Sequence, residues 1–396
     1  MHDTADCDVA IVGGGLAGGL IALALQRAQP RIEVRLIEAG PSFGGNHRWS
    51  WFEGDLDPET AALLDMFPHK RWHGGYDVRF RGFTRHLGSD YRSLASTDFD
   101  AVLRRSLPQQ AICCGQRANA LDASGVTLEN GTRLNAKTVI DCRDFTPSRH
   151  LRGGWQLFVG QHIHTLAPHD RSVPDIMDAD IDQFGAYRFV YSLPLGPQDI
   201  FVEDTYYADQ PALDRPELRR RVGAYCAKRG WEGSVESEEA GVLPVITGGD
   251  AQAHRREFST PGVALAGARG LFVHPLTSYT LPFAAANAIA IARHAQLSGP
   301  GLARLIEDRA RDHWRKTRFY RQLGKMLFSA AEPEERWRIF ARFYRLPEPL
   351  IARFYAGDSL ALDKLRLLTG KPPVPVLRGL SALLGKGAPL VKEDHT

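Results

Sequence analysis

The sequence lacks most of the features that mark secreted, metal-binding or redox-active thiol proteins. It has only five cysteines, an odd number, and no two of them have the C-x-x-C spacing of a metal or redox site. Its first residues include aspartates rather than a basic segment followed by an apolar stretch, which argues against a secretory signal. We therefore expect reduced thiols in a cytoplasmic protein.

Long apolar runs are also missing, with one exception. Residues 9–25 imitate a membrane span, but the run is short for the ~20 residues that a crossing helix needs. It also contains five glycines. A strand, a turn and a helix fit this segment better than a span does.

A strong net charge is absent, yet the charge is unevenly distributed. The chain is 43% apolar and 24% charged with a net charge of +3, as in ordinary soluble proteins. The segment 310–390 contains 16 Lys and Arg against 7 Asp and Glu. A basic C-terminal region on an acidic body predicts a surface that faces an anionic partner.

The apolar patterns predict an α/β fold that begins with a Rossmann-like dinucleotide-binding unit. Residues 8–12 form a β-branched run, 16–25 have helical spacing, and 32–37 alternate and end at an acid, which makes a β-α-β unit. Residues 41–54 have the composition of a loop. Runs rich in Phe, Tyr and Val predict antiparallel strands at 155–160, 186–195 and 199–207.

A late strand and helix return to the first unit, so we expect a second domain inserted within it. The expected parts are a first dinucleotide-binding segment (1–80), a mixed region (81–260), a final dinucleotide-binding segment (261–300) and a basic helical C-terminal region that faces a membrane (301–396). Within the mixed region, the strand 137–141 returns to the first domain and 150–245 form an antiparallel substrate domain.

The glycines after the first strand form a dinucleotide-binding fingerprint. Gly13-x-Gly15-x-x-Gly18 follows a strand and opens a helix, and Glu38 ends the next strand. Gly13 permits the tight turn, Gly15 lets the backbone approach a pyrophosphate, and Gly18 lets the helix pack on the strand. The helix N-terminus offers N–H groups to the phosphates, and the Glu38 carboxylate can accept the ribose hydroxyl protons.

FAD is the dinucleotide that the sequence favours. The fingerprint lies within the first twenty residues, as in many flavoproteins, and a late segment ending at Gly267 is similar to their flavin-contacting strand. Ala268 follows Gly267 where flavoproteins usually carry an acid. Arg48, just past a glycine-rich loop, is a candidate to pair with the pyrophosphate, the alternative being a solvated loop arginine.

Three further segments resemble motifs of the bacterial lycopene beta-cyclases. Residues 44–51 (Gly-Gly-Asn-His-Arg-Trp-Ser-Trp) follow the ribose-binding acid. Residues 201–207 are similar to the family's Phe-x-Glu-Glu-Thr segment, and 270–282 to its His-Pro-x-Thr-Gly-Tyr-Ser-Leu-Pro segment. Asp204 stands where the family has a second Glu, and Ser278 where Gly is common.

The resemblance implies a cyclisation without net redox change. The family closes the linear ψ-ends of lycopene and related carotenoids into β-ionone rings, giving β-carotene by way of γ-carotene. It needs reduced FAD, with NAD(P)H as the reductant. Glu203 is the candidate catalytic acid or acid/base, because burial among aromatic and β-branched neighbours would raise its pKa. Asp204 would point to the opposite face of the same strand.

The remaining candidates for the substrate pocket come from the same motifs. Aromatic faces can stabilise a passing cation, although ordinary packing is an alternative for each residue. The two histidines are not spaced as metal ligands, and we expect no metal. The candidates are His47, Trp49, Trp51, Asp204, His274 and Tyr279.

A bilayer-dissolved substrate implies docking on the inner face of the cell membrane without crossing it. Two C-terminal stretches combine apolar faces with arginines, as interfacial helices do, although amphipathic helices on a protein core have the same pattern. Nucleic acid is not an expected partner, because no recognition motif is present, and the oligomeric state is open. The apolar positions are Phe319, Leu323, Met326 and Leu327 in one stretch and Trp337, Phe340, Phe343 and Tyr344 in the other.

Two other functions are compatible with the glycine fingerprint. One is a redox enzyme of the same fold, either a flavin-dependent monooxygenase or a prenyl reductase. The other is a carotenoid-binding flavoprotein without catalysis. The segments around Glu203 and His274 favour the cyclase.

Overall fold

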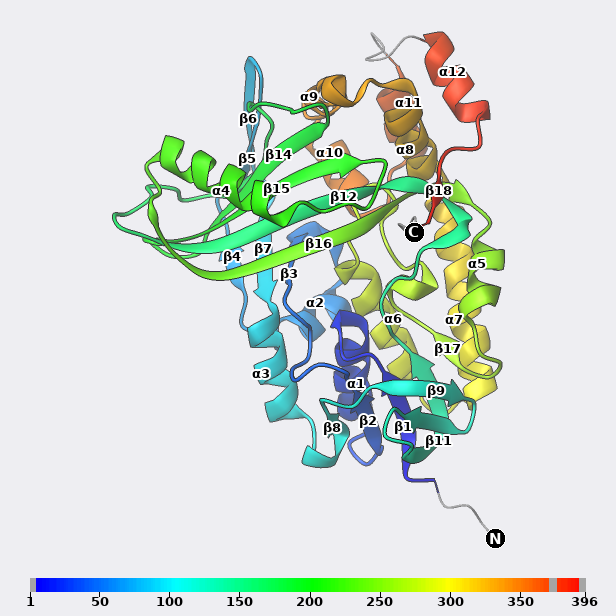
Figure 1. The fold of residues 1–396 in the computed structure, drawn as a ribbon. Helices are drawn as coiled ribbons and strands as arrows, with labels where there is room; N and C mark the ends of the chain where they lie inside the picture. Colours follow the sequence, from blue (N-terminus) through cyan, green and yellow to red (C-terminus); the bar gives the residue numbers. More distant parts are fainter. Residues whose placement is uncertain (1–4, 370–375, 392–396) are drawn as a thin grey trace.

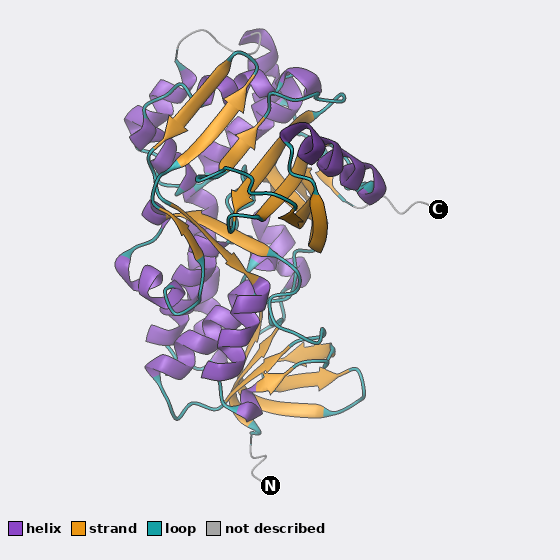
Figure 2. Cartoon of the chain, turned by 90° about the vertical axis from the view of Figure 1, so that its left-hand side faces the viewer, coloured by secondary structure: helices purple, strands orange, loops and turns teal. Residues whose placement is uncertain are grey.

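The computed structural model describes residues 5–369 and 376–391, apart from the side chains of 376, 380 and 383. Two large sheets lie at opposite ends of an elongated molecule (Figures 1 and 2). The first sheet carries the N-terminal β-α-β unit, and the second is mainly antiparallel. The predicted α/β class with a Rossmann-like unit and an antiparallel sheet is confirmed.

The first sheet has parallel strands at its centre and an antiparallel extension at one edge. Strand β1 pairs in parallel with β2 and β11, and β17 extends the parallel part beside β11. The order is β8 (Ile112–Cys113), β2 (Val34–Ile37), β1 (Cys7–Val12), β11 (Arg133–Asp141), β10 (Gly125–Leu128) and β9 (Ala118–Asp122), with β17 (Ala264–Leu265) beside β11.

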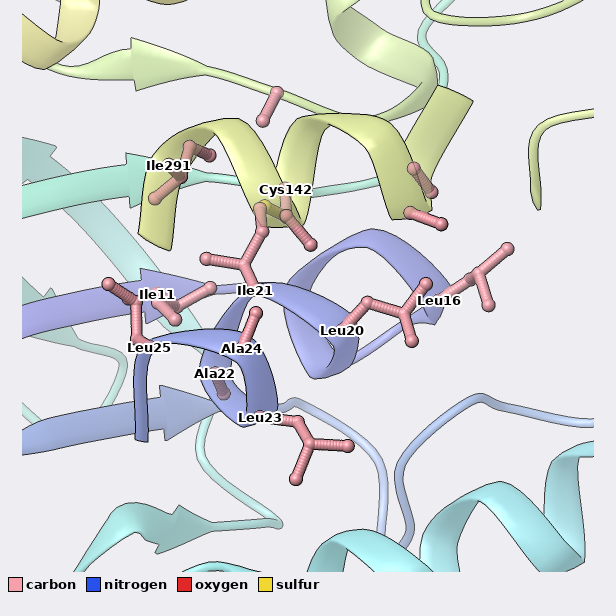
Figure 3. Close-up of a cluster of buried hydrophobic side chains, with 14 of the residues drawn as sticks. Ile11, Leu16, Leu20, Ile21, Ala22, Leu23, Ala24, Leu25, Cys142 and Ile291 are labelled. Carbon is pink, nitrogen blue, oxygen red and sulfur yellow. The ribbon is translucent and has the colours of Figure 1, made fainter. Parts of the chain in front are cut away.

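Two helices cover the parallel strands. Helix α1 (Leu16–Ala28) is buried along most of its length, because it packs against the sheet and against α6 (Leu281–Arg293). The α6 surface facing it is made of alanines, which allow a close approach, and Ile21 lies between the two helices (Figure 3). Residues 9–25 are therefore a strand, a turn and a helix, as the glycines predicted.

The second sheet is built on three long antiparallel strands. Alternate residues on one face are aromatic or aliphatic and form a core with the C-terminal helices, while helix α4 (Arg215–Arg229) covers the other face. The order is β16 (Gly233–Gly249), β12 (Ser148–Thr165), β15 (Asp199–Ala208), β14 (Tyr187–Pro194), β13 (Asp175–Asp178), β5 (Tyr76–Phe80) and β6 (Phe83–Leu87), with β18 (Pro389–Leu390) beside β12.

A three-stranded sheet is the third layer, and it corrects one prediction. Residues 41–54 were expected to be a loop, but Arg48–Phe52 form strand β3, which pairs with β7 (Tyr91–Ala95), as β4 (Lys70–Trp72) also does. Pairing between segments 40 residues apart determines this strand, so the local composition could not reveal it. Helices α2 (Pro58–Leu64) and α3 (Ser96–Ser106) flank it in the chain.

The C-terminal region is helical, but its aromatic faces turn inward. Seven of the eight apolar residues expected to face a membrane pack against the second core, with Leu327 and Tyr344 almost fully buried and only Met326 outside it. These seven residues therefore fit the alternative of amphipathic helices on a protein core, and these helices cover the aromatic face of the second sheet. Among the described residues, no helix is long and apolar enough to cross a membrane. Helix α7 (Gly299–Lys316) packs against β17 and β11 of the first sheet. The other helices after β16, apart from α6, are α5 (Ala251–Phe258), α8 (Arg318–Ala330), α9 (Trp337–Phe343), α10 (Glu348–Tyr355), α11 (Ala361–Leu368) and α12 (Val376–Leu384).

Candidate active site

Gly13 and Gly15 lie in the turn between β1 and α1, Gly18 lies in the first turn of α1, and each has a different steric environment. Gly13 has a φ of +101°, and a Cβ there would lie 2.7 Å from the carbonyl oxygen of Cys142. A Cβ on Gly18 would lie 1.9 Å from the Gly13 carbonyl oxygen, so helix and strand touch at this point. A Cβ on Gly15, at the N-cap of α1, would meet no atom within 4 Å. Open space therefore faces the helix N-terminus, where a pyrophosphate can approach the backbone.

Glu38 and Gly267 lie around the same turn. The Glu38 carboxylate accepts hydrogen bonds from the backbone N–H groups of Gly14, at 2.8 Å, and Gly40, at 2.7 Å. Gly267 has a φ of +68°, and a Cβ there would lie 3.2 Å from the Cβ of Ala17 in α1. The open cradle at Gly15 and the neighbouring carboxylate fit the phosphates and ribose of a dinucleotide.

A cavity of about 520 Å³ lies between the second sheet and the C-terminal helices. Its lining is mostly apolar and aromatic, as in sites for small hydrophobic ligands. Residues 47–50 and 276–281 form part of its wall, and these follow the glycine-rich segments 44–45 and 267–270 in the chain. These two glycine-rich segments also contact the nucleotide-binding turn, because the Gly44 N–H donates to the Gly14 carbonyl oxygen at 2.9 Å and Gly267 lies against Ala17. At α11 and α12 the wall is formed by Leu367, Leu368 and Gly379.

Glu203 faces this cavity from β15. It pairs with Gly160 of β12 on one side and with Tyr191 of β14 on the other. Burial raises the pKa of Glu203 to about 7, since its surroundings disfavour the carboxylate. The Thr205 hydroxyl, which donates to its Oε1 at 2.5 Å, opposes this shift. The side chain can therefore exist in either protonation state near neutral pH.

Asp204 is not in the cavity, which corrects its assignment as a pocket residue. Alternation along β15 turns it to the opposite face, where its carboxylate accepts three hydrogen bonds from Arg188, two from Nε and one from an Nη. Both side chains are almost fully buried. Asp204 is thus one half of an internal ion pair. It lies on the face of β15 opposite Glu203, as the alternation along the strand predicted.

A second acid, Glu239, lines the cavity from β16, and it belongs to none of the motifs in the sequence. Glu239 is 7% exposed and pairs with Gly160 across β12 from Glu203. Burial raises the pKa of Glu239 to about 9, and Glu203 adds to the shift, while Arg48 opposes it. No local signal distinguishes Glu239 from Glu236 and Glu238 in the same acidic segment, because its burial depends on strand pairing.

Tyrosine and serine hydroxyls form a chain along the cavity wall. The Tyr91 hydroxyl lies 3.0 Å from that of Tyr279 and 3.1 Å from that of Tyr191. Tyr191 donates in turn to Ser50 at 2.7 Å. Burial raises the pKa of all three tyrosines well above the usual value, so the hydroxyls stay neutral. Of the sequence candidates, Tyr279 belongs to this chain.

The aromatic and histidine candidates divide between the cavity and the core. His47 and Trp49 line the cavity, and burial lowers the pKa of His47. Trp51 does not: it shares with Trp49 the face of β3 opposite Arg48 and Ser50, and it is fully buried in the first core. His274 is also outside: it is fully buried against Tyr320 and Phe354, and burial lowers its pKa to about 3. These positions correct the assignment of Trp51 and His274.

Arg48 lines the cavity, and its contact with a pyrophosphate stays a prediction. Its guanidinium lies 5.7 Å from the centre of the Phe201 ring and donates to Ser93 at 3.4 Å. Strand β3 determines this direction, and the position beside Glu239 gives Arg48 a carboxyl neighbour. Among the described residues, no group of His, Cys, Asp or Glu is arranged to hold a metal ion.

Comparisons with known proteins agree with this arrangement. The model of the family described as lycopene cyclase protein matches residues 8–381. The chain is 43% identical to the lycopene beta-cyclase of Pseudescherichia vulneris, over 93% of this chain and 95% of that protein. It is 41% identical to the lycopene beta-cyclase of a Paracoccus strain, over 98% and 99% respectively.

A solved structure shows the same fold at lower sequence identity. Klebsiella pneumoniae HpxO, whose crystal structure holds FAD and uric acid, superposes with a TM-score of 0.59 at 17% identity, over 89% of this chain and 96% of that chain. At this identity the likeness establishes the fold alone. The family match and the two close relatives cover nearly the whole sequence, and the chain therefore belongs to the lycopene cyclase family.

Proposed function

We propose that this chain is a lycopene beta-cyclase that uses the Glu203 carboxyl to move protons in the cavity. The observation that carries the proposal is the placement of Glu203: an acid with a raised pKa faces an apolar cavity, and the segments 47–50 and 276–281 of its wall follow glycines that contact a nucleotide-binding turn. A carboxyl whose pKa lies near neutral pH can take up or release a proton in catalysis.

The cyclisation requires few polar groups. A proton is added to C2 at the ψ-end, the resulting C1 cation is attacked by the C5=C6 double bond, and loss of the C6 proton completes the ring. An apolar lining keeps water from the cation, and the aromatic side chains of Trp49 and Tyr279 present electron-rich rings beside it. The cavity therefore suits a hydrocarbon and a cationic intermediate.

The nucleotide-binding turn would hold FAD. Gly13, Gly15 and Gly18 would admit its pyrophosphate to the N-terminus of α1, and Glu38 would accept from its ribose. Reduced FAD, generated by NAD(P)H, would supply negative charge or a proton-transfer group beside the cavity. The family's reduced-flavin requirement is thus compatible with the residues of this turn.

The membrane-facing surface is proposed to lie on α11 and α12 rather than on α8 and α9. Three leucines there are among the most exposed large apolar residues: Leu362 at 76%, Leu377 at 81% and Leu384 at 89%. Exposed cations of the same region, Arg366 and Arg378, suit anionic headgroups. Because both helices also line the cavity, a bilayer-dissolved polyene would reach it here. We call this surface the leucine patch; it consists of Leu360, Leu362, Leu365, Leu368, Leu377 and Leu384.

The activity is tested by incubating the protein with lycopene, FAD and NADPH in D₂O without oxygen. A cyclase forms monocyclic and bicyclic products that contain solvent deuterium. A monooxygenase stops without oxygen, and a prenyl reductase consumes NADPH in proportion to product. Glu203→Gln should lower turnover by about 10²- to 10⁴-fold with flavin retained, whereas a carotenoid-binding protein would lose nothing.

The leucine patch is tested by sedimentation with vesicles that contain anionic lipids. Replacing Leu377 and Leu384 by Ser should reduce vesicle binding by about 100-fold or more, at about 1.5–3 kcal/mol for each inserted leucine. Leu166, which is 80% exposed outside the patch, provides the control: Leu166→Ser should bind like the parent protein. Equal binding of both variants would place the membrane contact elsewhere.

A further inference from the structure

Glu203 and Glu239 share one position in the sheet register. Both pair with Gly160, Glu203 from β15 and Glu239 from β16, so their side chains project to the same face on either side of β12. Two strand spacings separate their Cα atoms by about 10 Å. Gly160 contributes no side chain between them, and both acids line the cavity.

An aromatic ring fills the place of the missing Gly160 side chain. A Cβ on Gly160 would lie 2.3 Å from Cζ of Phe201, so this ring lies directly above the glycine. Phe201 is 4% exposed, and the Arg48 guanidinium lies above its ring. At Gly160 the floor between the two acids is therefore the apolar ring of Phe201.

The two acids have different surroundings, which suit different protonation states. Glu239 is 7% exposed, and burial together with Glu203 raises its pKa to about 9. Glu203 has a pKa raised only to about 7, and the Thr205 hydroxyl donates to its Oε1, a contact that favours the carboxylate. Near pH 8, Glu239 would hold a proton and Glu203 would be ionised.

Cyclisation places two proton transfers at different carbons, C2 and C6, on opposite sides of C1. On the proposed cyclase function, which this inference deepens, we propose that Glu239 donates the proton to C2 and that Glu203 accepts the proton from C6. The register at Gly160 places the donor and the acceptor on one face of the sheet, facing the same cavity.

The electrons and protons of this sequence balance. The Glu239 O–H bond breaks, and the C1=C2 π pair forms the new C2–H bond, which leaves a cation at C1. The C5=C6 π pair forms the C1–C6 bond, which moves the cation to C5. The C6–H bond then breaks, its electron pair restores C5=C6, and the proton passes to the Glu203 carboxylate. A proton returned to Glu239 and lost from Glu203 resets the site.

The test compares Glu239→Gln, Glu203→Gln and a matched control, Glu238→Gln, with the parent protein in D₂O. Glu238 is the next residue on β16, but it pairs with Arg219 outside the cavity. Both cavity variants should lose about 10²- to 10⁴-fold in cyclisation, and the control should stay within twofold of the parent. Flavin content and thermal unfolding verify that each variant is folded.

The deuterium content of recovered lycopene separates donor from acceptor. Glu203→Gln keeps the donor, so reversible protonation should place deuterium at C2 of unreacted lycopene. Glu239→Gln lacks the donor, so its recovered lycopene should stay unlabelled. Glu239→Asp, which retains an acid on a shorter side chain, should keep more activity than Glu239→Gln. This variant shows whether the loss in Glu239→Gln comes from the missing acid or from misfolding.

Three results would overturn the assignment. Cyclisation by Glu239→Gln at the parent rate would remove the donor role, as would labelled lycopene from Glu239→Gln. Labelled lycopene from neither variant would do the same. A parent protein that forms no cyclic product at all would instead refute the cyclase function, which is a different failure.

Discussion

The nucleotide-binding turn and the acid-lined cavity are adjacent, but they are built in different ways. The turn is made by six consecutive residues, 13–18, and its groups for the ligand are backbone N–H groups at a helix N-terminus. The cavity collects side chains from β3, β12, β15, β16 and the C-terminal helices. A backbone site is encoded by local spacing, whereas a side-chain site depends on the register of strands far apart in the chain.

Alanine substitutions at the turn should have the largest effect. Gly18→Ala places a Cβ 1.9 Å from the Gly13 carbonyl oxygen, so α1 must shift from β1, and we expect flavin binding to be lost together with thermal stability. Gly15→Ala meets no protein atom within 4 Å and should fold normally. It should nevertheless weaken flavin binding by tenfold or more, about 1.4 kcal/mol, because its methyl group occupies the pyrophosphate cradle.

Flavin fluorescence titration and thermal unfolding of the two variants measure this difference. Gly18→Ala should change both quantities, and Gly15→Ala should change only the first. If Gly15→Ala bound flavin like the parent protein, the open space at the N-terminus of α1 would not be the cofactor site. The nucleotide-binding turn would then not be a site made of backbone groups, and its contrast with the side-chain site of the cavity would fail.

The second-largest effect should distinguish the two neighbouring acids on β15. Asp204→Asn leaves the buried Arg188 guanidinium without its charged partner, which costs about 3–5 kcal/mol of unfolding free energy. Glu203→Gln removes an acid that burial already disfavours as a carboxylate, so the free energy of unfolding should fall little or rise. Urea denaturation at pH 8 measures both.

A double variant is the control for the ion pair. Arg188→Met combined with Asp204→Leu replaces both charges by apolar groups and should recover much of the stability lost in Asp204→Asn. Equal destabilisation by Asp204→Asn and Glu203→Gln would contradict the separate roles. The adjacent acids of the motif would then act as one unit.

The sequence was sufficient to predict the fold class and the position of the β-α-β turn. The glycine spacing, the helical period after Gly18 and the acid at Glu38 are local patterns, and each appears in the structure where it was expected. Alternation along β15 also predicted that Glu203 and Asp204 face opposite sides. Features that depend on neighbours within about 30 residues could therefore be predicted from the sequence.

The residues of the cavity could be predicted only in part, because many of them meet by pairing between distant segments. Glu239 was missed because its burial requires β16 to pair with β12 at Gly160, a contact across about 80 residues. Trp51 was misplaced because the strand that orients it forms only by pairing with β7. His274 belongs to a motif of the family, yet it is covered by Tyr320 and Phe354 from helices that the motif does not include. Motifs identified the segments, and tertiary pairing decided which side chains face the substrate.

The smallest effect we predict is the pH dependence of cyclisation, which is governed by the acids of the cavity alone. Glu203 must be ionised to accept a proton, so kcat/KM should rise through a pKa of about 7 as the pH increases. Glu239 must be protonated to donate, so kcat/KM should fall above about 9. Each limb changes the rate at most tenfold per pH unit.

The other groups that face these acids keep one form across that range. Burial lowers the pKa of His47 below its usual value and raises that of Tyr191, so both stay neutral, while Arg48 remains charged. Glu239→Asp should therefore displace only the alkaline limb, and Glu203→Asp only the acidic limb. An activity that declined steadily from pH 5 would mean that Glu203 works as the acid rather than as the acceptor, because its protonated form would then be the active one.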